Sequence, residues 1–202
     1  MQVFTDTLKK LTDLRWLNLF EIEFQHEKGG RSQWEFVSRK PHPSPGPAPI
    51  EPDAVFIVPI LKTPQGSRLA AVREFRVPLG DYEISFPAGL KEPGETVETT
   101  ARRELAEETG LMLTRVLAVS PPVVSTAGLS DESAVIAFVE CTGEPAPAGA
   151  DHSEEIEVLV LEYEAMLALR RSSAKFSAKA WCLLLMFEAL GEIALPEQLR
   201  RP

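Results

Sequence analysis

Three carboxylates share one face of a predicted helix. Glu104, Glu107 and Glu108 stand at spacings i, i+3 and i+4, and residues at these spacings are neighbours on a helix surface. Like charges so placed cost a solvated helix roughly 0.2–0.5 kcal/mol per pair, and the helix dipole disfavours anions near the C-terminus. A bound cation would remove both costs, and oxygen ligands suit Mg²⁺ or Mn²⁺. The alternative is a solvated acidic face that binds nothing.

The sequence also marks the ends of the helix that would carry these side chains. Helical spacing of apolar residues runs from Val97 to Thr109. Thr96 can serve as the N-cap, and Gly110 stands where helices commonly end in a left-handed residue. We therefore expect a helix over 97–109 with the carboxylates in its second half.

The residues around this helix follow a fixed pattern. From Gly89 to Leu111 the chain reads GLKEPGETVETTARRELAEETGL. The pattern consists of Gly89, Glu95, Arg103-Glu104-Leu105, Glu107-Glu108 and Gly110-Leu111. This segment matches the Nudix box at every specified position, so the chain resembles a Nudix hydrolase.

The resemblance implies a fold, a reaction and a metal site. The fold is an α/β/α sandwich with a mixed sheet, and the reaction is hydrolysis of a nucleoside diphosphate linked to another moiety. The implied metal ligands are Glu104, Glu107, Glu108 and the backbone carbonyl of Ala88 or Gly89. Arg103 and Glu95 are expected to pair and to support the loop and helix. Pyrophosphate hydrolysis needs neutralised oxygen charge and an activated water, and clustered metal ions supply both.

Beyond the box, the resemblance is closest to the ADP-ribose pyrophosphatases. It includes Arg-Glu-Phe-Arg at 73–76, Phe-Pro-Ala-Gly at 86–89 and a predicted hairpin segment at 30–39. In these enzymes the hairpin crosses a dimer, and an aromatic residue stacks on adenine across the interface. The implied substrate contacts are Trp34 on the base, Glu35 on the adenine amino group, Arg39 and Arg76 on phosphate or ribose, and Gly89. A hairpin core position is the other interpretation of Trp34, since core aromatics are common.

Two departures from this group bear on the substrate. Ala127 replaces the proline of a Ser-Pro-Gly-like loop, and Ser85 stands where a glutamate is common, with Glu83 two residues earlier on the same strand face. GDP-mannose or a broader range of nucleotide sugars is therefore the alternative substrate. A third hypothesis is a non-catalytic nucleotide-sensing domain, although such domains typically lose the box carboxylates that this chain keeps.

The general base is expected in an acidic loop before the last strand. In related pyrophosphatases a flexible loop supplies the base, and residues 149–157 occupy that place here. Spacing makes Glu154 the first candidate and Glu155 the second, while His152 could serve instead.

The order of predicted elements indicates an α+β fold. Alternating residues predict an N-terminal hairpin over 16–39, and six prolines in twelve residues make 41–52 a stiff connector. Strands are expected at 54–61, 68–74, 83–86, 113–120, 133–140 and 156–161, and further helices at 163–171 and 174–190. These elements mix without a βαβ rhythm. The predicted domains are a dimerisation element at 1–40, a connector at 41–53 and a Nudix domain at 54–202.

Composition restricts the partners. The chain has 202 residues, with 21 basic and 30 acidic side chains and a net charge of −9, which opposes binding to nucleic acid or anionic membrane. Cys141 and Cys182 form no zinc-binding or disulfide pattern, and no signal-peptide or membrane-spanning pattern is visible, so a cytoplasmic location is expected. A small hairpin is unstable alone, which predicts a homodimer. The hairpin could instead pack on its own subunit.

Overall fold

The computed structural model of the chain describes residues 1–146 and 155–199. The chain forms two compact units. Met1–Asp53 and Pro122–Ala134 make up the first, here called the N-terminal unit. The other described residues, from Ala54 to Pro121 and from Val135 onward, make up the sandwich unit. The sequence predicted a domain boundary near residue 53. It also placed residues 122–134 in the predicted Nudix domain, whereas in the structure they belong to the N-terminal unit.

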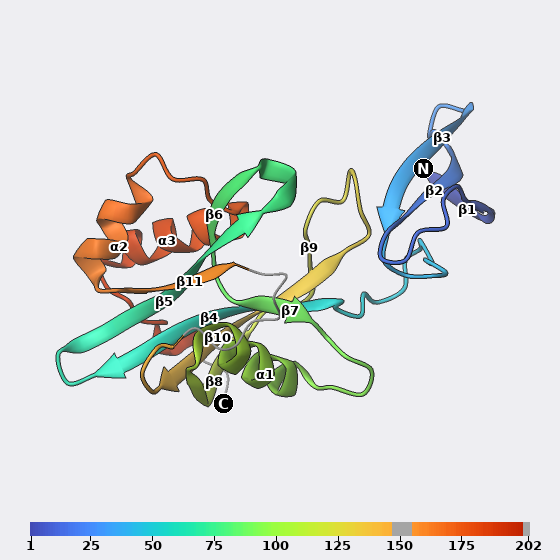
Figure 1. Cartoon of the computed structure of the whole chain (residues 1–202). Helices are drawn as coiled ribbons and strands as arrows, with labels where there is room; N and C mark the ends of the chain where they lie inside the picture. Colours follow the sequence, from blue (N-terminus) through green and yellow to red (C-terminus); the bar gives the residue numbers. More distant parts are fainter. Residues whose placement is uncertain (147–154, 200–202) are drawn as a thin grey trace. The chain divides into compact units, whose positions relative to one another are not determined.

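The N-terminal unit contains an antiparallel sheet in the order β1-β2-β3 (Figure 1). The strands are β1 (Gln2–Lys10), β2 (Asn18–Gln25) and β3 (Arg31–Ser38). The predicted hairpin is the β2–β3 pair, and its core is formed by Phe20, Ile22 and Phe36, with the two phenylalanine rings stacked at 5.7 Å. Strand β1 was not predicted, because its residues are mostly exposed and polar and so lack a clear alternation.

The sandwich unit is built on a second sheet with the central order β11-β5-β4-β10-β8. The long strands are β4 (Ala54–Thr63), β5 (Gly66–Arg76), β8 (Met112–Val119), β10 (Ser133–Thr142) and β11 (Ile156–Leu161). The shorter strands β6 (Asp81–Ser85) and β7 (Ala88–Leu90) pair with β5 and β4. Strand β9 (Val123–Val124), which lies in the segment assigned to the N-terminal unit, pairs with Ser133 and Ala134 at the start of β10. The arrows of β4 and β10 point the same way in Figure 1, whereas β5 is antiparallel to β4, so the sheet is mixed.

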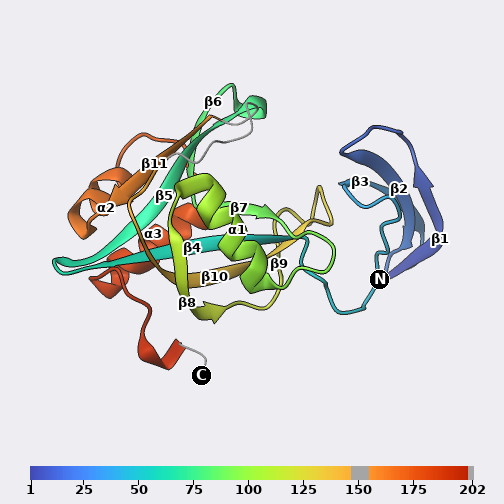
Figure 2. The ribbon, with the colours of Figure 1, turned by 60° about the horizontal axis from the view of Figure 1, so that its bottom comes forward.

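Helices cover both faces of this sheet. Alternate residues of β4 explain the arrangement, because Val55 and Ile57 pack with α1 (Val97–Thr109), while Phe56 and Val58 join the core of the other face. That second core includes side chains of α2 (Tyr163–Arg170) and α3 (Ala178–Leu190). Figures 1 and 2 show α1 on one side of the sheet and α2 and α3 on the other. The predicted α/β/α sandwich and the α+β class are confirmed.

The last helix begins later than predicted. Ser177 is its N-cap and accepts a hydrogen bond from the backbone of Ala180. The preceding residues run beside β6 instead, where Ile84 N donates to the carbonyl of Lys175 and Ser177 N donates to the carbonyl of Ile84. Two short 3-10 helices complete the elements, at Val77–Leu79 and Glu197–Leu199. Among the described helices, none is long and apolar enough to cross a membrane.

Candidate functional site

The helix α1 has the ends that its sequence predicts. The side chain of Thr96 accepts a hydrogen bond from the backbone N–H of Thr99, and Gly110 closes the helix in the left-handed region at φ 71°. Its buried residues, including Ala101 and Leu105, face the sheet. The acidic side chains therefore occupy the rest of the helix surface, beside strand β7 and the loop that follows it.

An ion pair fixes that loop to the helix. Arg103 donates from Nε to Glu95 Oε1 and from Nη2 to Glu95 Oε2, both at 3.0 Å, and also from Nη2 to the carbonyl of Leu90 at 3.1 Å. The guanidinium, followed by the backbone N–H of Glu92 and the hydroxyl of Thr100, lowers the pKa of Glu95 to about 2. The same pairing raises the pKa of Arg103. The expected Arg103–Glu95 pair is present and holds both ends of the loop.

Glu104 lies against the backbone of Gly89. A Cβ atom placed on Gly89 would be 1.8 Å from the Glu104 carboxylate, so a residue with a side chain could not occupy position 89 without displacing that carboxylate. The Glu104 side chain is only 12% exposed, and its Oε1 accepts from Arg103 Nη1 at 2.6 Å. The box glycine thus makes the space that Glu104 fills.

The two remaining carboxylates lie close by. Glu107 Oε2 is 3.3 Å from Arg103 Nη1, and its side chain is 60% exposed. Glu108 Oε1 accepts from the backbone N–H of Ala88 at 3.4 Å. The sequence-predicted residues at positions 88, 89, 103, 104, 107 and 108 are therefore brought together.

The donor chemistry of this cluster fits a hard divalent cation. The atoms it could offer to a metal are carboxylate and carbonyl oxygens, which Mg²⁺ and Mn²⁺ prefer. One nitrogen of Arg103 contacts both Glu104 and Glu107, so their carboxylates lie within reach of a single positive group. Within the described parts of the chain, no group of three Asp, Glu, His or Cys side chains is already arranged around a common metal position.

A second charged cluster lies on β5 and β6. Arg76 donates to Glu74 at 2.5 Å and to Glu83 at 3.3 Å, across the register that places Glu74 opposite Glu83. Glu74 and Arg76 alternate in step with Ala70, which packs in the α1 core, so this cluster faces the α1 side of the sheet. The sequence drew attention to Arg76 and Glu83 but not to Glu74, whose role depends on the strand register.

The region of the expected general base is described only in part. Glu154 and His152 lie outside the described residues. The side chain of Glu155 accepts a hydrogen bond from the Tyr82 hydroxyl, and its carbonyl accepts from Phe75 N at 3.2 Å. The bond to Glu155 raises the pKa of Tyr82. Glu155 therefore connects the start of β11 to β5 and β6 through these two hydrogen bonds.

The remaining predicted substrate contacts belong to the N-terminal unit. Trp34 is 50% exposed, and its ring packs edge-on against Phe24 with the ring centroids 6.4 Å apart. It is not among the buried residues of the small core, so the interpretation of Trp34 as a core residue is wrong. Glu35 is exposed, and Arg39 pairs with Glu132 at 3.2 Å. Trp16, which the strand pattern does not single out, is 68% exposed.

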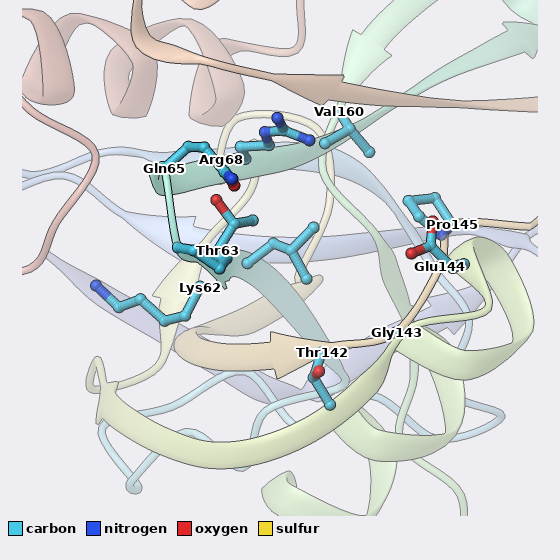
Figure 3. A pocket seen from close by; sticks show the side chains of 11 residues that line it. Lys62, Thr63, Gln65, Arg68, Thr142, Gly143, Glu144, Pro145 and Val160 are labelled. Atoms are coloured by element: carbon cyan, nitrogen blue, oxygen red, sulfur yellow. The ribbon is translucent and has the colours of Figure 1, made fainter.

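Two cavities of the sandwich unit lie apart from the carboxylate cluster. One has a volume of about 540 Å³ and is lined by the β4–β5 turn, the end of β10 and Val160; Figure 3 shows Arg68, Gln65 and Glu144 around it. The other, about 390 Å³, lies between β6 and the segment joining α2 to α3. Neither cavity is lined by a residue of α1.

Comparison with known proteins agrees with this geometry. The model of the NUDIX domain matches residues 51–182. The chain belongs to the Nudix family. A solved ADP compounds hydrolase has the same fold, with a TM-score of 0.69 at 20% identity over 95% of this chain and 96% of that one.

Two curated relatives carry more specific names. The ADP-ribose pyrophosphatase of Saccharomyces cerevisiae is 30% identical over 135 residues, or 66% of this chain and 56% of the yeast protein. The ADP-sugar pyrophosphatase of Mus musculus is 31% identical over 137 residues, or 67% of this chain and 60% of the mouse protein. The match thus spans less than two thirds of either relative.

Proposed function

We propose that this Nudix protein hydrolyses the pyrophosphate bond of ADP-ribose or a related nucleoside diphosphate sugar. The products would be a nucleoside monophosphate and a sugar phosphate. The observation that carries the proposal is the packing of Glu104 against Gly89, with the other box carboxylates and Arg103 beside it. The names of the yeast and mouse relatives support the choice of substrate class.

The box residues have distinct roles in this proposal. Glu104, Glu107 and Glu108, with the backbone carbonyl of Ala88, would hold Mg²⁺ or Mn²⁺. The bound metal would neutralise phosphate oxygens and lower the pKa of a water. Arg103 keeps the loop and two carboxylates in place through its hydrogen bonds to Glu95, Glu104 and Glu107.

The substrate contacts are assigned to the residues that the family resemblance implies. Trp34 would stack on the base and Glu35 would accept from its amino group, while Arg39, Arg76 and Gly89 would lie near phosphate or ribose. The exposure of Trp34 supports this role, because a stacking platform must be accessible. Arg76 would act while paired to Glu74 and Glu83, so its charge is partly neutralised before substrate arrives.

The general base is assigned to Glu154. Glu155 is the weaker candidate because its carboxylate already accepts from Tyr82. Replacing Glu154 with Gln should lower kcat and leave KM for ADP-ribose nearly unchanged, since a base acts in the chemical step. A loss of activity with Glu155→Gln but not with Glu154→Gln would reverse this assignment.

The N-terminal unit is proposed to form a homodimer interface, with residues 1–40 as the dimerisation element and 41–53 as the connector. Several large apolar side chains of this unit are exposed, including Leu14, Trp16 and Leu17, and such groups favour burial against another surface. Light scattering should give twice the chain mass. We also propose a cytoplasmic location, which the two free cysteines support.

The proposed activity is tested by comparing kcat/KM for ADP-ribose and GDP-mannose with Mg²⁺, with Mn²⁺ and with EDTA. ADP-ribose should be preferred, and EDTA should abolish turnover. GDP-mannose is the second candidate because Ala127 replaces the loop proline of the ADP-ribose group. A higher kcat/KM for GDP-mannose would establish it instead. Metal-independent turnover, or none with any nucleotide sugar, would contradict the proposal.

A further inference from the structure

A buried hydroxyl of α1 reaches the loop that precedes the helix. Thr100 is 0% exposed, and its Oγ1 donates to Glu95 Oε2 at 2.8 Å. The carbonyl of Thr96, four residues earlier, is the usual partner of a threonine within a helix and lies farther away, at 3.2 Å. A hydroxyl carries a single proton, so the main acceptor of Thr100 is the carboxylate of the loop residue.

The carboxylate of Glu95 is held in one orientation. Arg103 donates to it from Nε and from Nη2, and the backbone N–H of Glu92 and the hydroxyl of Thr100 donate as well. Three of these bonds converge on Oε2, whereas Arg103 Nε binds Oε1. Rotation of the carboxylate would break several of them together.

The guanidinium of Arg103 is fully used within the protein. Besides its two bonds to Glu95, Nη2 donates to the carbonyl of Leu90. Nη1 donates to Glu104 at 2.6 Å and to Glu107 at 3.3 Å. These bonds account for all five N–H groups of a guanidinium. The orientation that Glu95 imposes on Arg103 therefore also determines where Glu104 and Glu107 are held.

Thr100 differs from these residues in its burial. The side chains of Glu95, Arg103 and Glu107 are 14%, 26% and 60% exposed. An ion pair between partly exposed side chains must offset the rotamer entropy of both, so it does not by itself fix their positions. Thr100 is completely buried, next to Ala101 on the helix surface that faces the sheet. Its hydroxyl is thus a rigid point against which the Glu95 carboxylate is aligned.

We propose that Thr100 is a positioning residue for the metal-binding carboxylates. Its hydroxyl orients Glu95, and Glu95 in turn orients Arg103 beside Glu104 and Glu107. The inference rests on the metal assignment of the proposed function, because it takes these carboxylates to hold the metal. Thr100 acts through its neighbours and is not one of the specified positions of the box, so the family pattern does not predict this role.

A second buried threonine of α1 provides the matched control. Thr109 is also 0% exposed, and its Oγ1 donates to the carbonyl of Leu105 and accepts from Leu111 N. These bonds lie at the other end of the helix and do not involve Glu95. Valine has the shape of threonine without the hydroxyl, so Thr100→Val and Thr109→Val each remove buried hydrogen bonds. Both variants should therefore lower Tm by a few degrees.

The first measurement is Mn²⁺ binding without substrate, followed by EPR of the free ion. Thr100→Val should raise Kd about 3–10-fold, somewhat less than the loss of a direct partner of a metal ligand would cause. Thr100→Ser keeps the hydroxyl and should bind nearly as the wild type does, and Thr109→Val should leave Kd unchanged. Glu108→Gln should weaken binding most, which assigns the ion to this cluster.

Two further measurements separate positioning from stability. In ADP-ribose hydrolysis, Thr100→Val should raise the Mg²⁺ concentration for half-maximal rate by about the same factor as Kd. At saturating Mg²⁺ its kcat should differ from that of the wild type by less than about twofold. In a Glu95→Ala background, Thr100→Val should have no further effect on the Kd for Mn²⁺, because the carboxylate that it orients is gone.

The outcomes separate this inference from the proposed function. A wild-type Kd in Thr100→Val, an equal rise in Thr109→Val or Thr100→Ser, or an equal effect of Thr100→Val without Glu95 would overturn the positioning role. Each of these results leaves hydrolysis by the wild type, and with it the proposed function, intact. Mn²⁺ binding that depends on Thr100 in a protein that hydrolyses no nucleotide sugar would remove the proposed activity alone. Mn²⁺ binding unaffected by Glu108→Gln would remove the metal assignment and the inference together.

Discussion

The carboxylate cluster on α1 and a polar cluster of the N-terminal unit both contain cationic side chains, but their contacts span different lengths of chain. The polar cluster consists of Ser38, Arg39, Lys40, Asp53, Asp131, Glu132 and Ser133. Arg103 reaches Glu95 eight residues away, and Glu108 reaches Ala88 across 20 residues. Arg39 reaches Glu132 across 93 residues, and Asp53 binds Ser133 across 80. One cluster is set mainly by a single helix and its preceding loop. The other exists only once a distant loop has folded back.

The largest effect is expected from Glu108→Gln. If this carboxylate holds the metal, its loss removes several kcal/mol of transition-state stabilisation, or roughly 10²–10³-fold in kcat. Glu98→Gln on the same helix is the control, because within the described residues the one ion pair found for Glu98 is that with Arg102 on the exposed surface. Wild-type kcat with Mg²⁺ in the Glu108→Gln variant would show that this cluster is a solvated surface.

Gly89→Ala tests the close approach within the same cluster. The added methyl group would meet the end of the Glu104 side chain, which can move aside. Activity should fall, by about tenfold or more if the carboxylate is displaced from the metal, while Tm stays within a few degrees. Gly46→Ala is the control, since nothing lies within 4 Å of the added group. Unchanged kcat/KM in Gly89→Ala would contradict the role given to this contact.

The carboxylate cluster on α1 was predictable from the sequence because the residues that form it lie close together in the chain. The capping residues Thr96 and Gly110 mark the two ends of α1, and the helical repeat places the carboxylates on one surface. The Glu95–Arg103 pair followed from the family pattern. None of these inferences needed a contact between distant segments.

The rest depends on register and on long-range contacts. Glu74 joins Arg76 and Glu83 only because β5 pairs with β6 in one register. The position of 122–134 beside β3 is decided by hydrogen bonds such as Val37 to Leu129, which leave no periodic trace in the sequence. Strand β1 could not be predicted from the sequence for a similar reason. It is stabilised by hydrogen bonding to β2 and has no buried apolar face that would mark it in the sequence.

Lys40→Met should loosen the long-range cluster alone. It removes the ammonium shared by Asp53 and Asp131, at an expected cost of about 1 kcal/mol because the groups are partly exposed. Hydrogen exchange should accelerate in residues 31–53 and 122–134 but not in α1. Lys62→Met is the control, because it removes a hydrogen bond to Ser67 on the surface. Equal acceleration in α1 would show that the two regions are not separate.

The smallest effect concerns the thiol beneath α1. Burial, with the nearby Glu140 carboxylate, raises the pKa of Cys141 to about 12, so at pH 8 this thiol stays protonated and unreactive. Cys182 is exposed. A thiol reagent should therefore modify Cys182 but not Cys141 in the native protein. The same result is expected for the Lys40→Met variant. Reaction of Cys141 in that variant would mean that loosening has spread to the sandwich unit.

The central claim is that the α1 carboxylates support metal-dependent hydrolysis of a nucleotide sugar. The most direct measurement is the product analysis of ADP-ribose incubated with the wild-type protein and Mg²⁺, beside Glu107→Gln and an EDTA control. We expect AMP and ribose 5-phosphate from the wild type, and neither product from the variant or with EDTA. Equal product formation in all three reactions would contradict the claim.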